Sequence, residues 1–107
     1  MGPVAILTLA IITAYSPTID QCDSDPHITA SNQHVRIGIV ALSRDLEEKF
    51  SLKFGDFVHI EDIGTFVFQD RMHKRWRKKV DVFMWSRQKA MKFGKKEKYV
   101  YLMRRRR

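Results

Sequence analysis

The sequence predicts a mainly β protein that folds as a six-stranded β-barrel with two short helices. Three observations favour this class: apolar residues recur with a period of two in several short segments, turn-forming residues separate these segments, and two segments that begin at serine have helical spacing. A length of 107 residues suits a single domain, and an apolar fraction of 44% is typical of a globular core. We therefore expect one compact domain.

The first segment, GPVAILTLAIITAY, is apolar for about a dozen residues, which is short of the ~20 that a membrane-spanning helix needs. We therefore expect no stable membrane span and interpret the run as a buried strand that ends near Tyr15. A secretory signal would carry Lys or Arg ahead of the run, and none is present. The alternative is that this run is the remnant of a trimmed signal or anchor that merges into the first strand. We therefore divide the chain into an apolar N-terminal segment at 1–11 and a domain at 12–103.

Alternation with a period of two marks the later strands. Turn chemistry separates them at 23–26, at 55–56 and at 62–64, and the last of these turns joins two strands into a hairpin. The apolar positions that alternate are Val58 and Ile60, Val67 between Phe66 and Phe68, Val80 with Val82 and Met84, and Val100 with Leu102.

The first predicted helix spans residues 43–50, in SRDLEEKF. Its opening residue, Ser43, is expected to cap the free backbone N–H groups of the first turn. Leu46 and Phe50 lie on one face of this helix and should point toward the core.

The second predicted helix spans residues 86–93, in SRQKAMKF, and Ser86 is again the expected cap. Ala90 and Phe93 are expected to face inward, and Gly94 is suited to the left-handed conformation that ends a helix.

The two halves of the chain have opposite charge. Residues 1–70 contain ten acidic and four basic residues, a net of −6, whereas residues 71–107 contain sixteen basic and two acidic residues, a net of +14. The total of +8 favours anionic partners. Residues 104–107 form a basic tail, and most tails of this kind are only solvated.

Asp81 is the first candidate for chemistry, because an isolated carboxylate in a strand of Val and Phe is costly to place without a partner or a purpose. It points away from the valine face, so it is expected on a groove surface or at the barrel rim. There it is a candidate general acid, and the alternative is a structural salt bridge. Basic neighbours lower a carboxyl pKa and burial raises it, and the sequence leaves open which dominates. Asp70, which closes the strand FVFQD, either has a functional role or caps the following turn.

Several other chemistries are not favoured. Cys22 is the only cysteine, which excludes an internal disulfide and a cysteine zinc site. The four histidines lack the spacing of a metal site, so no metal is expected. Ser31 has histidines nearby but no nucleophile elbow around it, so a serine hydrolase is not supported. No segment indicates a cofactor.

Trp76 lies in HKRWRKK, which is too polar to be core throughout. Aromatic faces bind the apolar C–H surfaces of sugars, although aromatic residues more often pack in a core. Basic residues interleaved with aromatics also suit nucleic acid, but this run is short and matches no named nucleic-acid module.

The ordered set of these segments resembles the three-aspartate, or 3D, domain of bacterial cell-wall proteins, related to the stationary-phase survival factors and to the C-terminal part of membrane-bound lytic murein transglycosylase A. The resemblance covers the chain from Ile12 onward. The segments that carry it are ITAYSP (12–17), DSDPHITAS (23–31), IGIVALSRDL (37–46), FGDFVHIEDIGTFVFQD (54–70), VDVFM (80–84) and SRQKAMKFGKK (86–96).

The resemblance implies a double-psi β-barrel that cleaves the glycan strands of peptidoglycan between N-acetylmuramic acid and N-acetylglucosamine, with release of a 1,6-anhydro sugar. It implies that Asp81, in VDVF, is the catalytic acid and base, and that Asp70, eleven residues earlier, is its partner aspartate. Asp70 would raise the pKa of Asp81 by like-charge repulsion or position the sugar. An exported protein, in the cell envelope or secreted, is then expected.

Four further residues are candidates for contact with the glycan. Arg75 would bind carboxylate or N-acetyl oxygens, and Trp76 would stack on a sugar ring. Thr29 and Ser31 either form hydrogen bonds with the substrate or hold their own loop.

The sequence departs from the family pattern at three places. Ser43 occupies the position of the remaining family aspartate, with Asp45 two residues late, and RMHK follows Asp70 where many relatives have DTGG. Asn32 replaces a glycine, which puts little in doubt because asparagine tolerates left-handed geometry. These departures motivate a second hypothesis, a non-catalytic cell-wall-binding module of the same fold. A third, less favoured, is a nucleic-acid or polyanion binder, motivated by the basic half. We expect a monomer.

Overall fold

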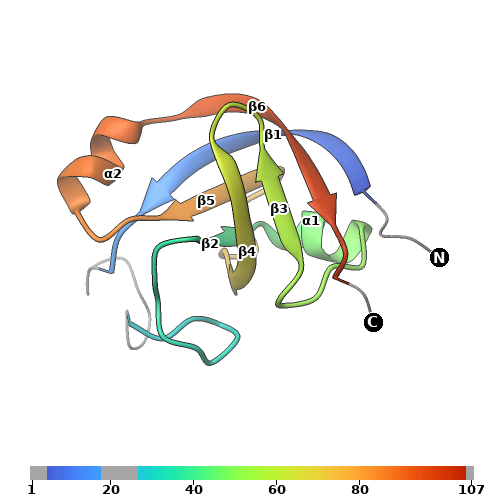
Figure 1. The fold of residues 1–107 in the computed structure, drawn as a ribbon, viewed down its shortest axis with the longest axis horizontal. Helices are drawn as coiled ribbons and strands as arrows, with labels where there is room; N and C mark the ends of the chain where they lie inside the picture. Colours follow the sequence, from blue (N-terminus) through green and yellow to red (C-terminus); the bar gives the residue numbers. More distant parts are fainter. Residues whose placement is uncertain (1–4, 18–26, 106–107) are drawn as a thin grey trace.

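A computed structural model describes residues 5–17 and 27–105 (Figure 1). Six strands close into a barrel in the order β1-β5-β2-β4-β3-β6, and two short helices lie at opposite ends of it in Figure 1. This confirms a mainly β, six-stranded barrel with two helices. The bounds are β1 Ala5–Tyr15, β2 Ile39–Leu42, α1 Arg44–Lys49, β3 Phe57–Ile60, β4 Gly64–Arg71, β5 Lys79–Phe83, α2 Arg87–Phe93 and β6 Lys96–Met103. The turn expected at 23–26 lies outside the described residues.

The barrel combines two kinds of strand pairing. β1 pairs with β5, and β2 with β4, in parallel, whereas the other neighbours are antiparallel. The predicted hairpin is confirmed: β3 and β4 pair antiparallel around a turn in which Asp62 has a φ of 65°. Parallel pairs need long crossover connections, so strands that pair in parallel come from distant parts of the chain.

The core fills the barrel interior with alternate residues from all six strands. Val80 and Val82 point inward from β5, as do Val100 and Leu102 from β6, and all four are buried as the alternation predicted. Phe68 of β4 is a large, fully buried side chain of this cluster. The residues between these positions therefore face outward, and Asp81 is one of them.

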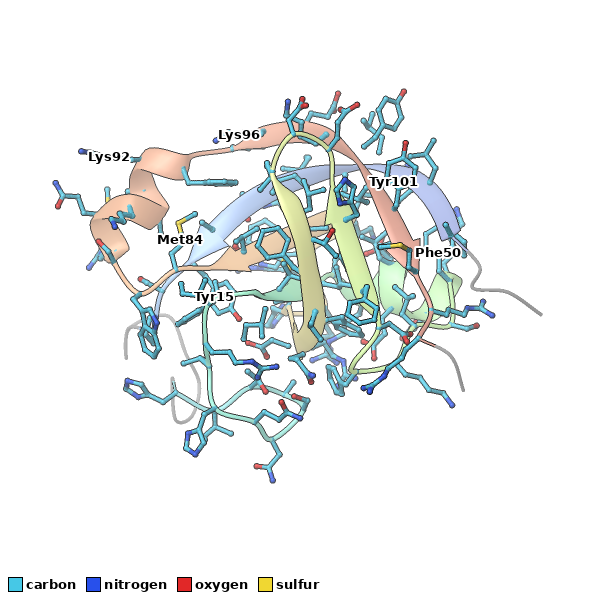
Figure 2. The ribbon with its side chains drawn as sticks, in the orientation of Figure 1. Tyr15, Phe50, Met84, Lys92, Lys96 and Tyr101 are labelled. Carbon is cyan, nitrogen blue, oxygen red and sulfur yellow. The ribbon has the colours of Figure 1, made fainter. Side chains whose placement is uncertain are left out.

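The first strand is continuous from Ala5 to Tyr15, so the boundary drawn between residues 11 and 12 falls inside it. The expectation of a buried strand is wrong for one of its faces, because a barrel strand buries only alternate residues. Leu7 and Leu9 are 54% and 40% exposed. They lie opposite Tyr101 and Tyr99 of β6, which are also exposed, and Figure 2 labels Tyr101 there.

The helix caps differ from each other. Ser86 accepts a hydrogen bond from the Lys89 backbone N–H at 3.2 Å and caps α2 as predicted, and Gly94 ends that helix with a φ of 70°. Ser43 does not cap α1: it is fully buried, and its hydroxyl oxygen accepts from the Lys79 backbone N–H at 3.0 Å instead. The predicted cap is wrong there because the neighbouring strand β5 offers a buried donor at the same point.

The inward residues of the two helices are buried to different degrees. Leu46 of α1 is buried in the core, and Phe50 packs against it. No residue of α2 is fully buried, although Phe93 packs against the core cluster. Neither helix in the described part of the chain has the length and apolar composition that a membrane crossing requires.

The basic tail begins in contact with the barrel. The guanidinium group of Arg104 donates to the carbonyl of Phe50 from Nε at 3.2 Å and from Nη2 at 3.0 Å. This first residue of the tail is therefore held by the end of α1, whereas residues 106–107 lie outside the described part.

Candidate functional site

Four strands each bring one residue to a single row on the outside of the barrel. Along β4, β2, β5 and β1, Asp70 lies opposite Ala41, Ala41 opposite Asp81, and Asp81 opposite Thr13. Residues directly opposite each other project from the same side of a sheet. Two strand spacings, ~10 Å between Cα atoms, separate the two aspartates. We call these four residues the aspartate row.

A β-bulge brings Asp70 into this row. β2 and β4 pair in step as far as Val40 and Phe68, and then the register shifts so that Ala41 lies opposite Asp70. Without the shift, Gln69 would lie opposite Ala41 and Asp70 would turn toward the core. Gln69 is buried instead, and its Oε1 has no hydrogen-bond partner among the described residues.

The carboxylate of Asp81 is partly buried and accepts a hydrogen bond from the Thr13 hydroxyl at 2.9 Å. Burial raises the pKa of Asp81 to about 6, against the Thr13 hydrogen bond and the Lys79 cation, which lower it, and with a smaller contribution from Asp70, which raises it. Burial therefore outweighs the basic neighbourhood. The described residues contain the ion pairs Arg71–Glu47 and Lys98–Asp62, and Asp81 is in neither.

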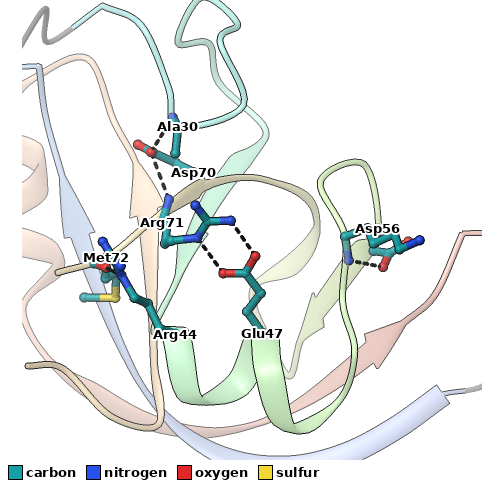
Figure 3. Close-up of polar contacts among 8 residues, drawn as sticks. Ala30, Arg44, Glu47, Asp56, Asp70, Arg71 and Met72 are labelled. Carbon is teal, nitrogen blue, oxygen red and sulfur yellow. Dashed lines mark hydrogen bonds and ion pairs between the residues drawn. The ribbon is translucent and has the colours of Figure 1, made fainter. Parts of the chain in front are cut away.

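Asp70 is held by three donors. Its Oδ1 accepts from the backbone N–H groups of Ala30 and Arg71, both at 2.9 Å, and its Oδ2 accepts from the Tyr15 hydroxyl at 3.1 Å. Figure 3 shows the two backbone bonds. Asp70 therefore joins three segments around the row: β1, the loop at 27–38 and β4.

Thr29 and Ser31 hold the loop that covers Asp70. The hydroxyl groups of Thr29 and Ser31 lie 2.8 Å apart, and the Thr29 oxygen accepts from the Gln33 N–H at 3.2 Å. The Ser31 N–H donates to the carbonyl of Gln69 at 3.2 Å. Thr29 is buried and Ser31 is partly exposed, so of the two only Ser31 offers a hydroxyl to the surface.

Arg75 and Trp76 lie in the β4–β5 connection. The Trp76 ring is half-buried, with the Lys79 Nζ 3.8 Å and the Arg75 Cζ 4.8 Å from its centroid. Lys79 thus lies close to both Trp76 and Asp81. A sugar that stacked on Trp76 would compete with these two cations for the ring.

Asp45, which lies two residues after the position of the remaining family aspartate, has a structural role. Its two oxygens accept from the backbone N–H of Lys78 at 3.2 and 3.0 Å, just before β5 begins. Burial raises its pKa, but hydrogen bonds from the Ser43 hydroxyl and the Lys78 backbone lower it overall. Asp45 therefore anchors the start of the Asp81 strand and is not part of the aspartate row.

A surface hollow of about 320 Å³ lies away from the row, between α1 and β4. In this hollow Arg71 and Glu47 form a bidentate ion pair, which Figure 3 shows. The Arg71 Nε donates to the Glu47 Oε1 at 2.6 Å, and the Arg71 Nη2 donates to the Glu47 Oε2 at 2.6 Å. Its lining residues are Arg44, Glu47, Glu48, Ser51, Leu52 and Arg71. Neither aspartate of the row lines it, so this hollow is not the candidate site.

Sequence reasoning did not find Thr13 or Tyr15, which bind the two aspartates. Both lie in the ITAY segment at outward positions of β1, and only the parallel pairing of β1 with β5 brings Thr13 to Asp81. One sequence signal could have indicated them: Thr13 and Tyr15 place hydroxyl groups two positions apart in an otherwise apolar strand.

No protein-family model and no curated protein matches this sequence. The described residues contain no group of three or more His, Cys, Asp or Glu placed to hold a metal ion. The class that the fold and the site define is a closed six-stranded β-barrel with a partly buried carboxyl group of raised pKa on the outer face of its sheet.

Replacing Thr13 by valine is expected to raise the pKa of Asp81 further, by roughly one pH unit, because the hydroxyl stabilises only the ionised carboxylate. The carboxyl carbon shift of Asp81 measured by NMR against pH checks this. Tyr15→Phe is the matched control, since it removes a hydroxyl from Asp70 and should leave the pKa of Asp81 nearly unchanged. Equal titration curves for Thr13→Val and the wild type would contradict the role assigned to the hydroxyl.

Proposed function

We propose that this protein is a lytic transglycosylase domain of the 3D family that cleaves peptidoglycan glycan strands. The observation that carries the proposal is Asp81, a partly buried carboxyl group outside the barrel core with a pKa raised to about 6. Such a group can both donate and accept a proton near neutral pH, which a free aspartate with a pKa of ~3.9 does poorly.

The fold and the aspartate row agree with the sequence resemblance. A closed barrel with two parallel strand pairs is compatible with the double-psi topology that the resemblance implies. The family pattern pairs Asp81 with Asp70, and in the row these residues flank the small Ala41.

The reaction needs one group that acts twice. In this proposal the protonated Asp81 donates to the glycosidic oxygen, and the bond from that oxygen to C1 of the muramic residue breaks. The C6 hydroxyl oxygen of the same residue bonds to C1, and the Asp81 carboxylate takes the hydroxyl proton. The products are a 1,6-anhydro sugar and a free 4-hydroxyl, and no water is consumed. A water-activating second carboxylate is therefore not required, unlike in most glycosidases.

Asp70 then has a positioning role. Its contacts with Tyr15, Ala30 and Arg71 fix the loop beside the row, and its charge contributes to the raised pKa of Asp81. The net positive charge of the protein favours approach to anionic wall polymers, which suits an exported protein.

The test is digestion of purified murein sacculi, with anhydro-muropeptides detected by mass spectrometry. Wild-type protein is expected to release them, and Asp81→Asn to lower the rate at least ~100-fold, because it removes the only proton donor in the proposed reaction. Thr65→Ala, an exposed β4 substitution, is the matched control and should act like the wild type. Absence of anhydro products from the wild type, or an unchanged rate in Asp81→Asn, would overturn the proposal.

A second candidate is a wall-binding module without activity, favoured by the cations that cover Trp76 and by Ser43 at the position of the third family aspartate. It predicts that sacculi sediment the protein while no product appears. Sedimentation and product release, measured in one experiment, separate the two candidates.

A further inference from the structure

The connection between β4 and β5, residues 72–78, is the most basic ordered segment of the described chain. We call it the basic loop. It exposes four permanent cations in five positions, Lys74, Arg75, Arg77 and Lys78. None of them forms an ion pair among the described residues, where the ion pairs join Arg71 to Glu47 and Lys98 to Asp62. Their charge is therefore available to a partner.

The loop is fixed at both ends. Met72 is buried, its N–H donates to the Leu42 carbonyl at 2.9 Å, and its carbonyl accepts from the Arg44 Nε at 3.2 Å. At the other end Lys78 N–H binds both oxygens of Asp45. Because both ends of the loop are anchored, its backbone is already fixed. The loop therefore loses less conformational freedom when a ligand binds.

A turn inside the loop adds further order. The N–H of Trp76 donates to the His73 carbonyl at 3.0 Å, and the N–H of Arg75 approaches the His73 Nδ1 at 3.1 Å. Because Arg75 and Lys79 lie against the Trp76 ring, a flat base or sugar would compete with two cations for it. The chemistry that this surface offers is repeated positive charge.

We propose that the basic loop binds the charged backbone of a linear, phosphate-bearing polymer. Repeated phosphates neutralise successive Lys and Arg side chains and release counterions, and this needs no stacking of bases. The loop starts two residues after Asp70 and ends three residues before Asp81, so a polymer held there lies next to the aspartate row.

This inference does not depend on the proposed glycan cleavage, because its probe, long-chain inorganic polyphosphate, contains no sugar. The affinity is measured by titration calorimetry between about 50 and 200 mM salt, a range over which phosphate contacts weaken strongly. Wild-type binding is expected to fall steeply across it.

The loop variant replaces Lys74, Arg75, Arg77 and Lys78 by Gln. Its affinity is expected to fall at least ~10-fold, and the slope of log affinity against log salt to become shallower by about 3, because four phosphate contacts are lost. The matched control replaces four exposed cations of α2 and the segment after it, Arg87, Lys89, Lys92 and Lys95, by Gln. It changes the net charge equally, and Figure 2 shows Lys92 on α2. Its affinity should fall less than ~3-fold.

A smaller variant, Lys74→Gln with Arg77→Gln, leaves the Arg75 contact with Trp76 intact and should show about half the change in slope. Equal losses in the loop variant and the α2 control would overturn the inference, because net charge alone would then explain binding. Absence of polyphosphate binding by the wild type would also overturn it. A single-stranded oligonucleotide is the second probe, and much tighter binding to it that Trp76→Leu abolishes would show recognition of bases instead.

Discussion

The Asp81→Asn variant is expected to be more stable than the wild-type protein by about 2 kcal/mol at pH 7.5, and equally stable at pH 4. Burial raises the pKa of Asp81 from 3.8 to about 6 in the folded chain. Between these values the folded state binds more protons than the unfolded state, so this carboxyl group supports stability fully below about pH 4. Its contribution is lost as the pH rises through 6.

The free energy of unfolding, measured by urea titration at several pH values, checks this expectation. Asparagine keeps an oxygen that can accept from the Thr13 hydroxyl, so the comparison isolates the charge. A variant less stable than the wild type at pH 7.5, or a difference that does not change with pH, would show that burial does not raise the pKa of Asp81. This outcome bears on the site whether or not murein is the substrate.

The Asp56→Ala variant is expected to lose about 3 kcal/mol of stability, because two backbone N–H groups lose a buried, charged acceptor. Asp56 is 2% exposed, and its carboxylate accepts from the N–H groups of Lys53 at 2.8 Å and Arg105 at 2.7 Å. Figure 3 labels this residue in the loop before β3, and its bond to Arg105 ties that loop to the segment that follows β6. It connects segments about fifty positions apart.

Thermal and urea unfolding of three variants measures this effect. Asp56→Asn keeps one acceptor oxygen and should lose less than Asp56→Ala. Asp62→Ala removes an exposed carboxylate that pairs with Lys98 at 3.2 Å, and it should change stability by no more than about 0.5 kcal/mol. If Asp56→Ala and Asp62→Ala cost the same, the buried hydrogen bonds of Asp56 would not stabilise the fold as argued.

Local patterns in the sequence predicted the elements well. Period-two alternation located the strands around Val58, Val80 and Val100, and serine caps with helical spacing located both helices. These signals arise from contacts between neighbours in the chain, which periodicity reports directly. The Ser43 cap failed because a residue 36 positions away, Lys79, supplied its partner.

The candidate site was predictable only in part. Asp81 could be selected because a carboxylate among valines needs an explanation, and Asp70 was selected through the family resemblance. Their placement in one row depends on a bulge after Val40 and on the pairing of β1 with β5, and neither has a local signal. Thr13 was missed for this reason.

The members of the aspartate row are drawn from positions 13, 41, 70 and 81, so the row exists only once the first strand has docked against the fifth. Before that event Asp81 is a solvated acid with the ordinary aspartate pKa of ~3.9. The raised pKa of this carboxyl group is therefore a property of the completed fold, because its burial and its Thr13 partner both require β1 to be in place.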